Sequence, residues 1–198
     1  MSGRYVVFEG GEGSGKSTQA RRLAERLGAL LTKEPGATEI GVRIRELLLD
    51  PASGEIDDRT EALLMLADRA QHLADVVVPT LVTGRDVVSD RSSYSTLAYQ
   101  GHGRGLSLND LRGLCDWACA GRWPDLVILL DLPVEVGFSR LGEPDRMEQA
   151  GAEFHERVRA GYLQLARDEP QRWVVIDADA SPDEVEQRIL AEVVDRIG

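Results

Sequence analysis

The sequence has few cysteines, few histidines and no long apolar run. Cys115 and Cys119 are its only cysteines, and they stand four positions apart in an expected helix. We interpret them as small apolar side chains on one helical face. The three histidines show no ligand spacing, so no cysteine–histidine metal site is predicted. No stretch of about 18 apolar residues is present, which excludes a membrane-spanning helix. We expect no signal peptide and a cytoplasmic protein.

Positive charge is also scarce. The formal net charge is −11, whereas proteins that hold a nucleic-acid backbone usually carry a basic face, so binding to a nucleic-acid polymer is not expected. Only two of the 23 basic residues are lysines, Lys16 and Lys33. A lysine retained in such a chain marks a position where arginine does not serve, so both become candidates for function.

The arrangement of apolar segments predicts an α/β fold. Short apolar runs predict five strands: Tyr5–Phe8, Leu30–Thr32, Asp86–Asp90, Leu126–Asp131 and Trp173–Ile176. Amphipathic segments between them predict helices, the longest over Thr60–Val78, and a helix from Arg91 that frays at Gly101–Gly105. This alternation predicts three layers, with a five-stranded parallel sheet between helices. The length suits one domain over residues 1–198, with a flap at about 141–150.

One motif carries the chemistry. Gly10–Ser17 fits the pattern G-x-x-x-x-G-K-[ST] and lies between a predicted strand and a predicted helix. A chance match is on the order of 10⁻³. Glycines let backbone amides converge on phosphates, and the helix start adds its positive dipole end. The segment predicted to bind ATP, the phosphoryl donor, comprises Gly10, Gly11, Glu12, Gly13, Ser14, Gly15, Lys16, Ser17 and Thr18.

Two carboxylates end predicted strands beside this loop. Asp90 ends the third strand, at the edge where open parallel sheets bind ligands, so we expect it to hold Mg²⁺ through water, with Ser17 as the second metal contact. Glu9 ends the first strand. A carboxylate beside a phosphate site is repelled unless a metal or a sugar hydroxyl pairs with it, so Glu9 is expected on the acceptor side.

Taken together, the motifs resemble those of bacterial thymidylate kinases. The resemblance rests on Phe8–Thr18, Lys33–Thr38, Asp90-Arg91 and Leu97–Gly101, and extends through Trp123–Leu126 and Asp145–Gln149. It implies a P-loop kinase fold and transfer of the ATP γ-phosphoryl group to dTMP, which gives dTDP and ADP for dTTP synthesis. It also implies Mg²⁺ as cofactor and a homodimer formed through helices that flank the sheet.

The resemblance also implies residue roles. Arg45 and Arg91 would bind the acceptor phosphate, Arg69 and Gln100 would read the thymine edge, and Tyr99 would pack against the deoxyribose. The full acceptor set is Glu9, Lys33, Pro35, Arg45, Met65, Arg69, Arg91, Thr96, Tyr99 and Gln100. The catalytic set is Glu9, Lys16, Arg91 and Arg146, with Arg140 on the ATP side.

Some positions depart from the family pattern. Lys33 stands where arginine is common, Ala37 where a second glycine is frequent, Met65 where phenylalanine usually stacks on the base, and Ser92 where an aromatic residue is frequent. With glycine at position 13, the phosphate-binding loop supplies no arginine, so a flap arginine must act. The short flap Arg140–Arg146 holds two, and the sequence does not decide between them.

Rival functions remain. A deoxynucleoside kinase acting on thymidine would share Glu9, the loop and Asp90-Arg91-Ser92, but its neutral acceptor would not need Arg45. A GTPase switch would need an Asn-Lys-x-Asp segment, and the only asparagine is Asn109. A structural protein that merely binds ATP also remains open.

Overall fold

The computed structural model describes residues 2–142 and 145–197. Its five strands are β1 (Tyr5–Gly10), β2 (Leu30–Lys33), β3 (Val87–Asp90), β4 (Leu126–Asp131) and β5 (Trp173–Asp177). All neighbouring pairs are parallel, in the order β2-β3-β1-β4-β5. The predicted five-stranded parallel sheet is confirmed, and each strand lies within two residues of its expected bounds.

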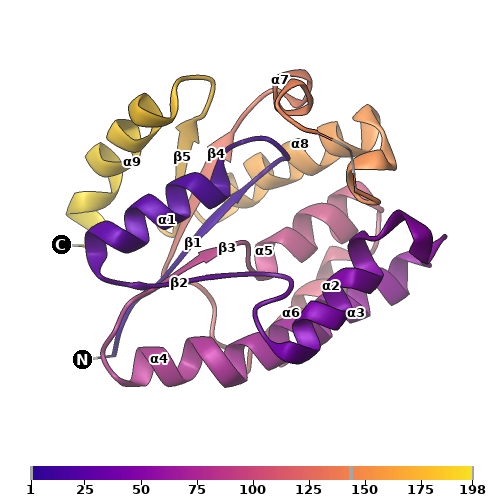
Figure 1. Cartoon of the computed structure of the whole chain (residues 1–198), viewed down its shortest axis with the longest axis horizontal. Coiled ribbons are helices and arrows are strands. Elements are labelled where there is room, and N and C mark those ends of the chain that lie inside the picture. Colours follow the sequence, from indigo (N-terminus) through magenta and orange to yellow (C-terminus); the bar gives the residue numbers. More distant parts are fainter. Residues whose placement is uncertain (1, 143–144, 198) are drawn as a thin grey trace.

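Helices cover both faces of the sheet (Figure 1). They are α1 (Lys16–Leu27), α2 (Glu39–Leu49), α3 (Asp58–His72), α4 (Val78–Val82), α5 (Ser93–Thr96), α6 (Leu108–Ala118), α7 (Val134–Ser139), α8 (Ala152–Asp168) and α9 (Pro182–Ile197). Short 3₁₀ turns occupy Pro51–Ser53 and Glu148–Ala150. None of these described helices is long and apolar enough to cross a membrane.

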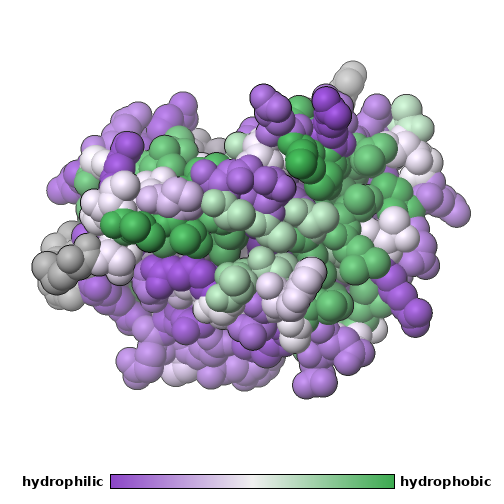
Figure 2. All heavy atoms as spheres, turned by 90° about the horizontal axis from the view of Figure 1, so that it is seen from below, coloured by the Kyte–Doolittle hydropathy of each residue, from purple (hydrophilic) through white to green (hydrophobic). Residues whose placement is uncertain are grey.

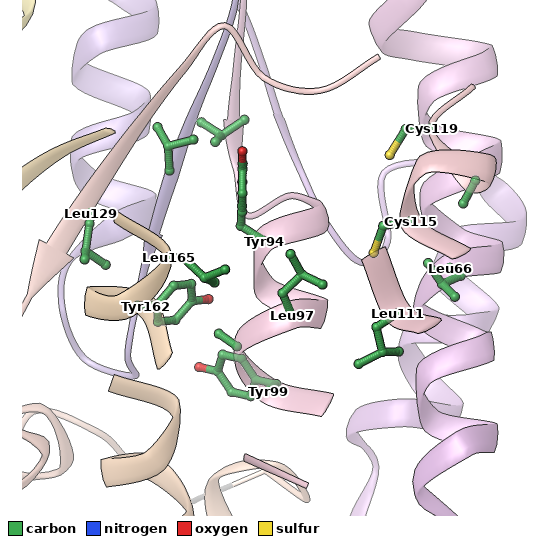
Figure 3. Close-up of a cluster of buried hydrophobic side chains, with 14 of the residues drawn as sticks. Leu66, Tyr94, Leu97, Tyr99, Leu111, Cys115, Cys119, Leu129, Tyr162 and Leu165 are labelled. Atoms are coloured by element: carbon green, nitrogen blue, oxygen red, sulfur yellow. The ribbon is translucent and has the colours of Figure 1, made fainter. Parts of the chain in front are cut away.

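Alternation along β1 divides the core in two. Val6 and Phe8 face α1 and α9, whereas Tyr5 and Val7 face the cluster built by α3, α5, α6 and α8. This is the period of two that places successive strand residues on opposite faces. Figure 3 shows Cys115 of α6, and Cys119 directly after that helix, pointing toward the cluster that contains Tyr94 and Tyr162. Both are buried, as expected of small apolar side chains, and neither forms a disulfide.

Two helix predictions were wrong in extent. The helix expected to end at Val78 continues to Val82, through a π-helical turn at Leu73–Val77. That turn places Pro79 in the first turn of α4, where a missing N–H is tolerated. The helix expected from Arg91 begins instead at Ser93, because the Ser92 hydroxyl accepts a hydrogen bond from the Tyr94 amide and caps it.

The expected fraying at Gly101 was also wrong. The chain continues as a π-helix over Leu97–Gly103. Its glycines allow close packing, since a Cβ at Gly101 would lie 2.4 Å from Leu108 and one at Gly103 would lie 2.6 Å from Phe154. The wider helical turn carries Tyr99 and Gln100, two of the expected site residues.

Candidate active site

A cavity of about 450 Å³ opens at the carboxyl ends of the strands. One end is formed by the phosphate-binding loop and the other by α2, α3 and the π-helix. Of the expected residues, those that line it are Glu12, Gly13, Gly15, Lys16, Ser17, Thr18, Lys33, Pro35, Arg45, Met65, Arg69, Asp90, Arg91, Thr96, Tyr99, Gln100 and Arg140. Expected donor and acceptor groups therefore share one cavity.

The phosphate-binding loop folds around the Lys16 ammonium group. Lys16 is buried, and its Nζ donates a hydrogen bond to the Gly11 carbonyl at 2.7 Å. Burial, followed by repulsion from Arg91, lowers the pKa of Lys16. Gly13 has a φ of 68°, and a Cβ there would lie 2.2 Å from the Gly137 carbonyl oxygen in α7. No side chain, arginine included, fits at position 13 in this arrangement.

The residues expected to hold Mg²⁺ meet beside the loop. The Ser17 hydroxyl donates a hydrogen bond to Oδ2 of Asp90. The second oxygen, Oδ1, is buried with no hydrogen-bond partner among the described residues. Mg²⁺ prefers oxygen ligands and keeps several of its waters, so an unpartnered carboxylate oxygen beside a hydroxyl suits a hydrated magnesium ion.

Arg91 lies between the two ends of the cavity. It has a φ of 78°, rare for a residue with a side chain. Its guanidinium donates to Oε1 of Glu12 at 2.6 Å and to the Tyr99 hydroxyl at 3.1 Å. Burial alone would raise the pKa of Glu12, but attraction from Arg91 and then Lys16 lowers it to about 2. The carboxylate is therefore ionised and holds Arg91 in place.

Glu9 lies beneath the cavity and is fully buried. Its carboxylate accepts hydrogen bonds from the hydroxyls of Ser92 at 2.7 Å, Ser95 at 2.6 Å and Tyr162 at 2.8 Å. Burial raises its pKa, and these hydrogen bonds oppose the rise. Ser95 itself lines the cavity, so Glu9 holds the Ser95 hydroxyl in place in the cavity wall.

Arg69 belongs to a buried hydrogen-bond network at the end of the cavity opposite the phosphate-binding loop. Its guanidinium donates to Glu34 at 2.8 Å, to the Thr96 hydroxyl at 2.7 Å and to the Ser92 carbonyl at 2.7 Å. The other oxygen of Glu34 lies 2.8 Å from Nδ1 of His72. Burial alone would raise the pKa of Glu34, but Arg69, followed by His72, lowers it. The Arg69 guanidinium is thus held rigidly at the cavity wall.

The comparisons with known proteins agree with this geometry. A family model described as thymidylate kinase matches residues 8–189. The chain belongs to the thymidylate kinase family. It is 48% identical to a thymidylate kinase of Cutibacterium acnes, over 98% of this chain and 97% of that protein. It is 49% identical to one of Carboxydothermus hydrogenoformans, over 93% and 94%.

Solved structures agree as well. The crystal structure of thymidylate kinase from Ehrlichia chaffeensis superposes with a TM-score of 0.81 at 28% identity, covering 98% of this chain and all of that one. The likeness extends over nearly the whole chain, so the P-loop kinase fold expected from the sequence is confirmed.

The structure separates the two flap arginines. Arg146 does not line the cavity; its Nε donates to the Leu48 carbonyl at 2.6 Å, and its Nη2 pairs with Glu61 at 2.6 Å. Arg140 lines the cavity beside the phosphate-binding loop, and its contacts to Gly13, Ala178 and Asp179 are all 3.5 Å long. Within the expected flap, residues 143 and 144 lie outside the described part of the chain.

Sequence reasoning missed several residues. The cavity is also lined by Glu34, Leu49, Asp68, Ser95, Asp145, Met147 and Glu148. Gly10, Gly11 and Ser14 shape the loop without lining the cavity. Glu34 lies within the Lys33–Thr38 segment, which supported the resemblance, so position was the one available signal for it.

Proposed function

We propose that this chain transfers the γ-phosphoryl group of ATP to the phosphate of dTMP, giving dTDP and ADP. The observation that carries the proposal is one continuous cavity, with Lys16 and Ser17 at one end, Arg69 and Gln100 at the other, and Arg91 between them. A fixed arginine between the two ends of the cavity suits an acceptor whose phosphate is already a dianion, because guanidinium groups match the geometry of phosphate oxygens.

Phosphoryl transfer requires positioning and charge neutralisation rather than covalent chemistry. Lys16 binds the β- and γ-phosphates, while Arg45 and Arg91 hold the acceptor phosphate in line. Ser17 and Asp90 hold the hydrated Mg²⁺, which supplies charge neutralisation on the phosphate oxygens. No strong general base is needed, because the acceptor phosphate is already ionised near neutral pH.

Arg140 is the flap cation in this proposal. Its side chain is 37% exposed and held only by long contacts, so it is free to turn toward a phosphate beside Gly13. Arg146 instead anchors the flap segment to α2 and Glu61. The proposal extends to the flap at about 141–150 as a lid of one domain spanning residues 1–198.

A homodimer is also proposed. Apolar side chains are exposed on three helices, of which α2 and α6 each pack against α3: Ile40, Val42 and Leu47 on α2, Leu63 on α3, and Leu108, Leu114 and Trp117 on α6. Figure 2 shows hydrophobic side chains gathered over the end of the molecule that carries α2 and α3. Burial of such a face against a second copy favours association. Light scattering tests it, and a monomer mass would contradict it.

We place the protein in the cytoplasm, which suits its two free cysteines.

A coupled ADP-release assay across several acceptors tests the function. We expect turnover with dTMP, weak turnover with dUMP, because one missing methyl group supplies only about 1–3 kcal/mol of discrimination, and negligible turnover with dCMP. Preference for thymidine over dTMP would instead favour the deoxynucleoside kinase, and ATP binding without any transfer would favour a structural role.

A further inference from the structure

Glu61 is a fully buried carboxylate behind the acceptor end of the cavity. Its Oε1 accepts hydrogen bonds from Nε2 of Gln100 at 2.9 Å and from Nε of Arg104 at 3.2 Å. Its Oε2 accepts from Arg104 at 3.1 Å and from Arg146 at 2.6 Å. Two arginines and one amide therefore converge on a single buried acid, which does not itself line the cavity.

The charge on Glu61 determines which way the Gln100 amide faces. Burial alone would raise the pKa of Glu61, but hydrogen bonds from Arg104, Gln100 and Arg146 lower it. An ionised carboxylate only accepts hydrogen bonds, whereas a glutamine amide has a donor end and an acceptor end. The NH₂ group of Gln100 must therefore face Glu61. The amide oxygen then lies on the opposite side, toward the cavity that Gln100 lines.

Arg69 supplies the complementary group. A guanidinium carries five N–H donors and no acceptor, and the bonds to Glu34, Thr96 and Ser92 use one donor on each of its three nitrogens. The cavity end thus presents donors from Arg69 and an acceptor from Gln100. A thymine ring offers a carbonyl oxygen at C4 and an N–H at N3. A cytosine ring offers an amino group and an unprotonated nitrogen at those atoms, the reverse pattern.

We propose that Glu61 is a positioning residue for base selection: it fixes the Gln100 amide with its oxygen toward the base, so that the acceptor site admits a ring with N3–H and rejects one whose N3 is an acceptor. Arg104 and Arg146 keep this acid charged. The inference rests on the proposed function, because it assigns a residue to the choice of acceptor.

The test is the Glu61→Gln variant. An amide at position 61 has nearly the same shape as the carboxylate but can donate as well as accept hydrogen bonds. The side-chain amide of Gln100 can then flip, so that its nitrogen faces the cavity. We expect dTMP to bind at least about 10-fold more weakly, with dCMP binding unchanged or tighter, measured by titration calorimetry. The turnover number at saturating dTMP should stay within about 3-fold, because the phosphates are held elsewhere.

Two further variants separate positioning from simple destabilisation. Arg104→Gln removes one ion pair of Glu61, but the pair with Arg146 remains and keeps the carboxylate charged and facing Gln100. The ratio of the dissociation constants for dTMP and dCMP should therefore stay within about 3-fold of wild type. In a Gln100→Leu background, Glu61→Gln should no longer change that ratio. A folded Glu61→Gln protein with the wild-type ratio, or an effect that persists without Gln100, would overturn the inference.

A measurement on the wild-type protein covers the case in which Glu61→Gln does not fold. The side-chain amide protons of Gln100, observed by nuclear magnetic resonance without nucleotide, should exchange with water far more slowly than those of an exposed glutamine. Exchange at the free rate would show that the amide is not fixed and would overturn the inference. Wild-type protein that fails to phosphorylate dTMP would instead refute the proposed function, so the two failures are distinguishable.

Discussion

Matched substitutions of the two flap arginines should affect different properties: one lowers the turnover number and the other lowers the stability. Arg140→Met removes a cation beside the phosphate-binding loop, and an arginine that neutralises the transferred group contributes roughly 10³–10⁵ in rate. We therefore expect its turnover number to fall at least about 10²-fold, with a modest change in ATP affinity. The lost contacts are all 3.5 Å long and partly exposed, so stability should change by less than about 1 kcal/mol.

Arg146→Met should mainly lower stability. It removes charge-assisted hydrogen bonds of 2.6 Å to Leu48 and to Glu61, while Glu61 retains Arg104 and Gln100. We estimate a loss of about 2–3 kcal/mol, which lowers the melting temperature by about 4–12 °C in a protein of this size.

Thermal unfolding and the coupled ADP-release assay, applied to both variants below their melting temperatures, separate the two roles. Turnover within about 3-fold of wild type for Arg140→Met would refute the assignment. So would a 10²-fold loss of turnover in a fully stable Arg146→Met protein.

Three other predictions concern the donor half of the site. Asp90→Asn should raise the Mg²⁺ concentration needed for half-maximal activity at least about 10-fold; an unchanged magnesium titration would remove this residue from the metal site. The pKa of Glu12 is lowered to about 2 from 4.5, so its stabilising contribution is present above pH 4.5 and is lost as the pH falls toward 2. Urea titrations should therefore show that the difference in the free energy of unfolding between wild type and Glu12→Gln becomes smaller as the pH is lowered from about 6 to about 3. A difference that stays constant with pH would contradict this prediction. Gly137→Ala would bring a Cβ to 2.3 Å from the Glu12 carbonyl oxygen and should raise the KM for ATP at least about 10-fold, whereas Gly113→Ala, with open space at its Cβ, should not.

The fold and the donor site follow from local patterns in the sequence. Five apolar runs predict the strands, and Gly10–Ser17 identifies the phosphate-binding loop because its spacing and its place between strand and helix are both local. Asp90 follows in the same way from its position at a strand end. These features are determined by neighbours along the chain, so a single sequence contains them.

The acceptor half depends on contacts between distant residues. Glu61 meets Gln100 39 positions away and Arg146 85 positions away, and Glu34 meets Arg69 across 35. No periodicity or spacing indicates such pairs. A buried acid on an amphipathic helix looks, in the sequence, like a solvated one. Arg146 was expected in catalysis because the resemblance requires an arginine from the flap, and nothing near it in the chain indicates its ion pair with Glu61.

The π-helix over Leu97–Gly103 was missed for a different reason. A π-helix bonds residues five apart instead of four, but over only seven residues the hydrophobic pattern is too short to distinguish the two spacings. Gly101 and Gly103 were expected to end a helix, whereas their missing side chains make room for Leu108 and Phe154.

Phosphoryl transfer between two nucleotides held in one cavity is the activity proposed for this chain. Phosphorus nuclear magnetic resonance of the protein with ATP, Mg²⁺ and dTMP tests it directly, because it follows every phosphate at once. We predict that ADP and dTDP accumulate in equal amounts while free phosphate stays at background. Release of inorganic phosphate with dTMP unchanged, or no loss of the γ-phosphate signal, would contradict the account.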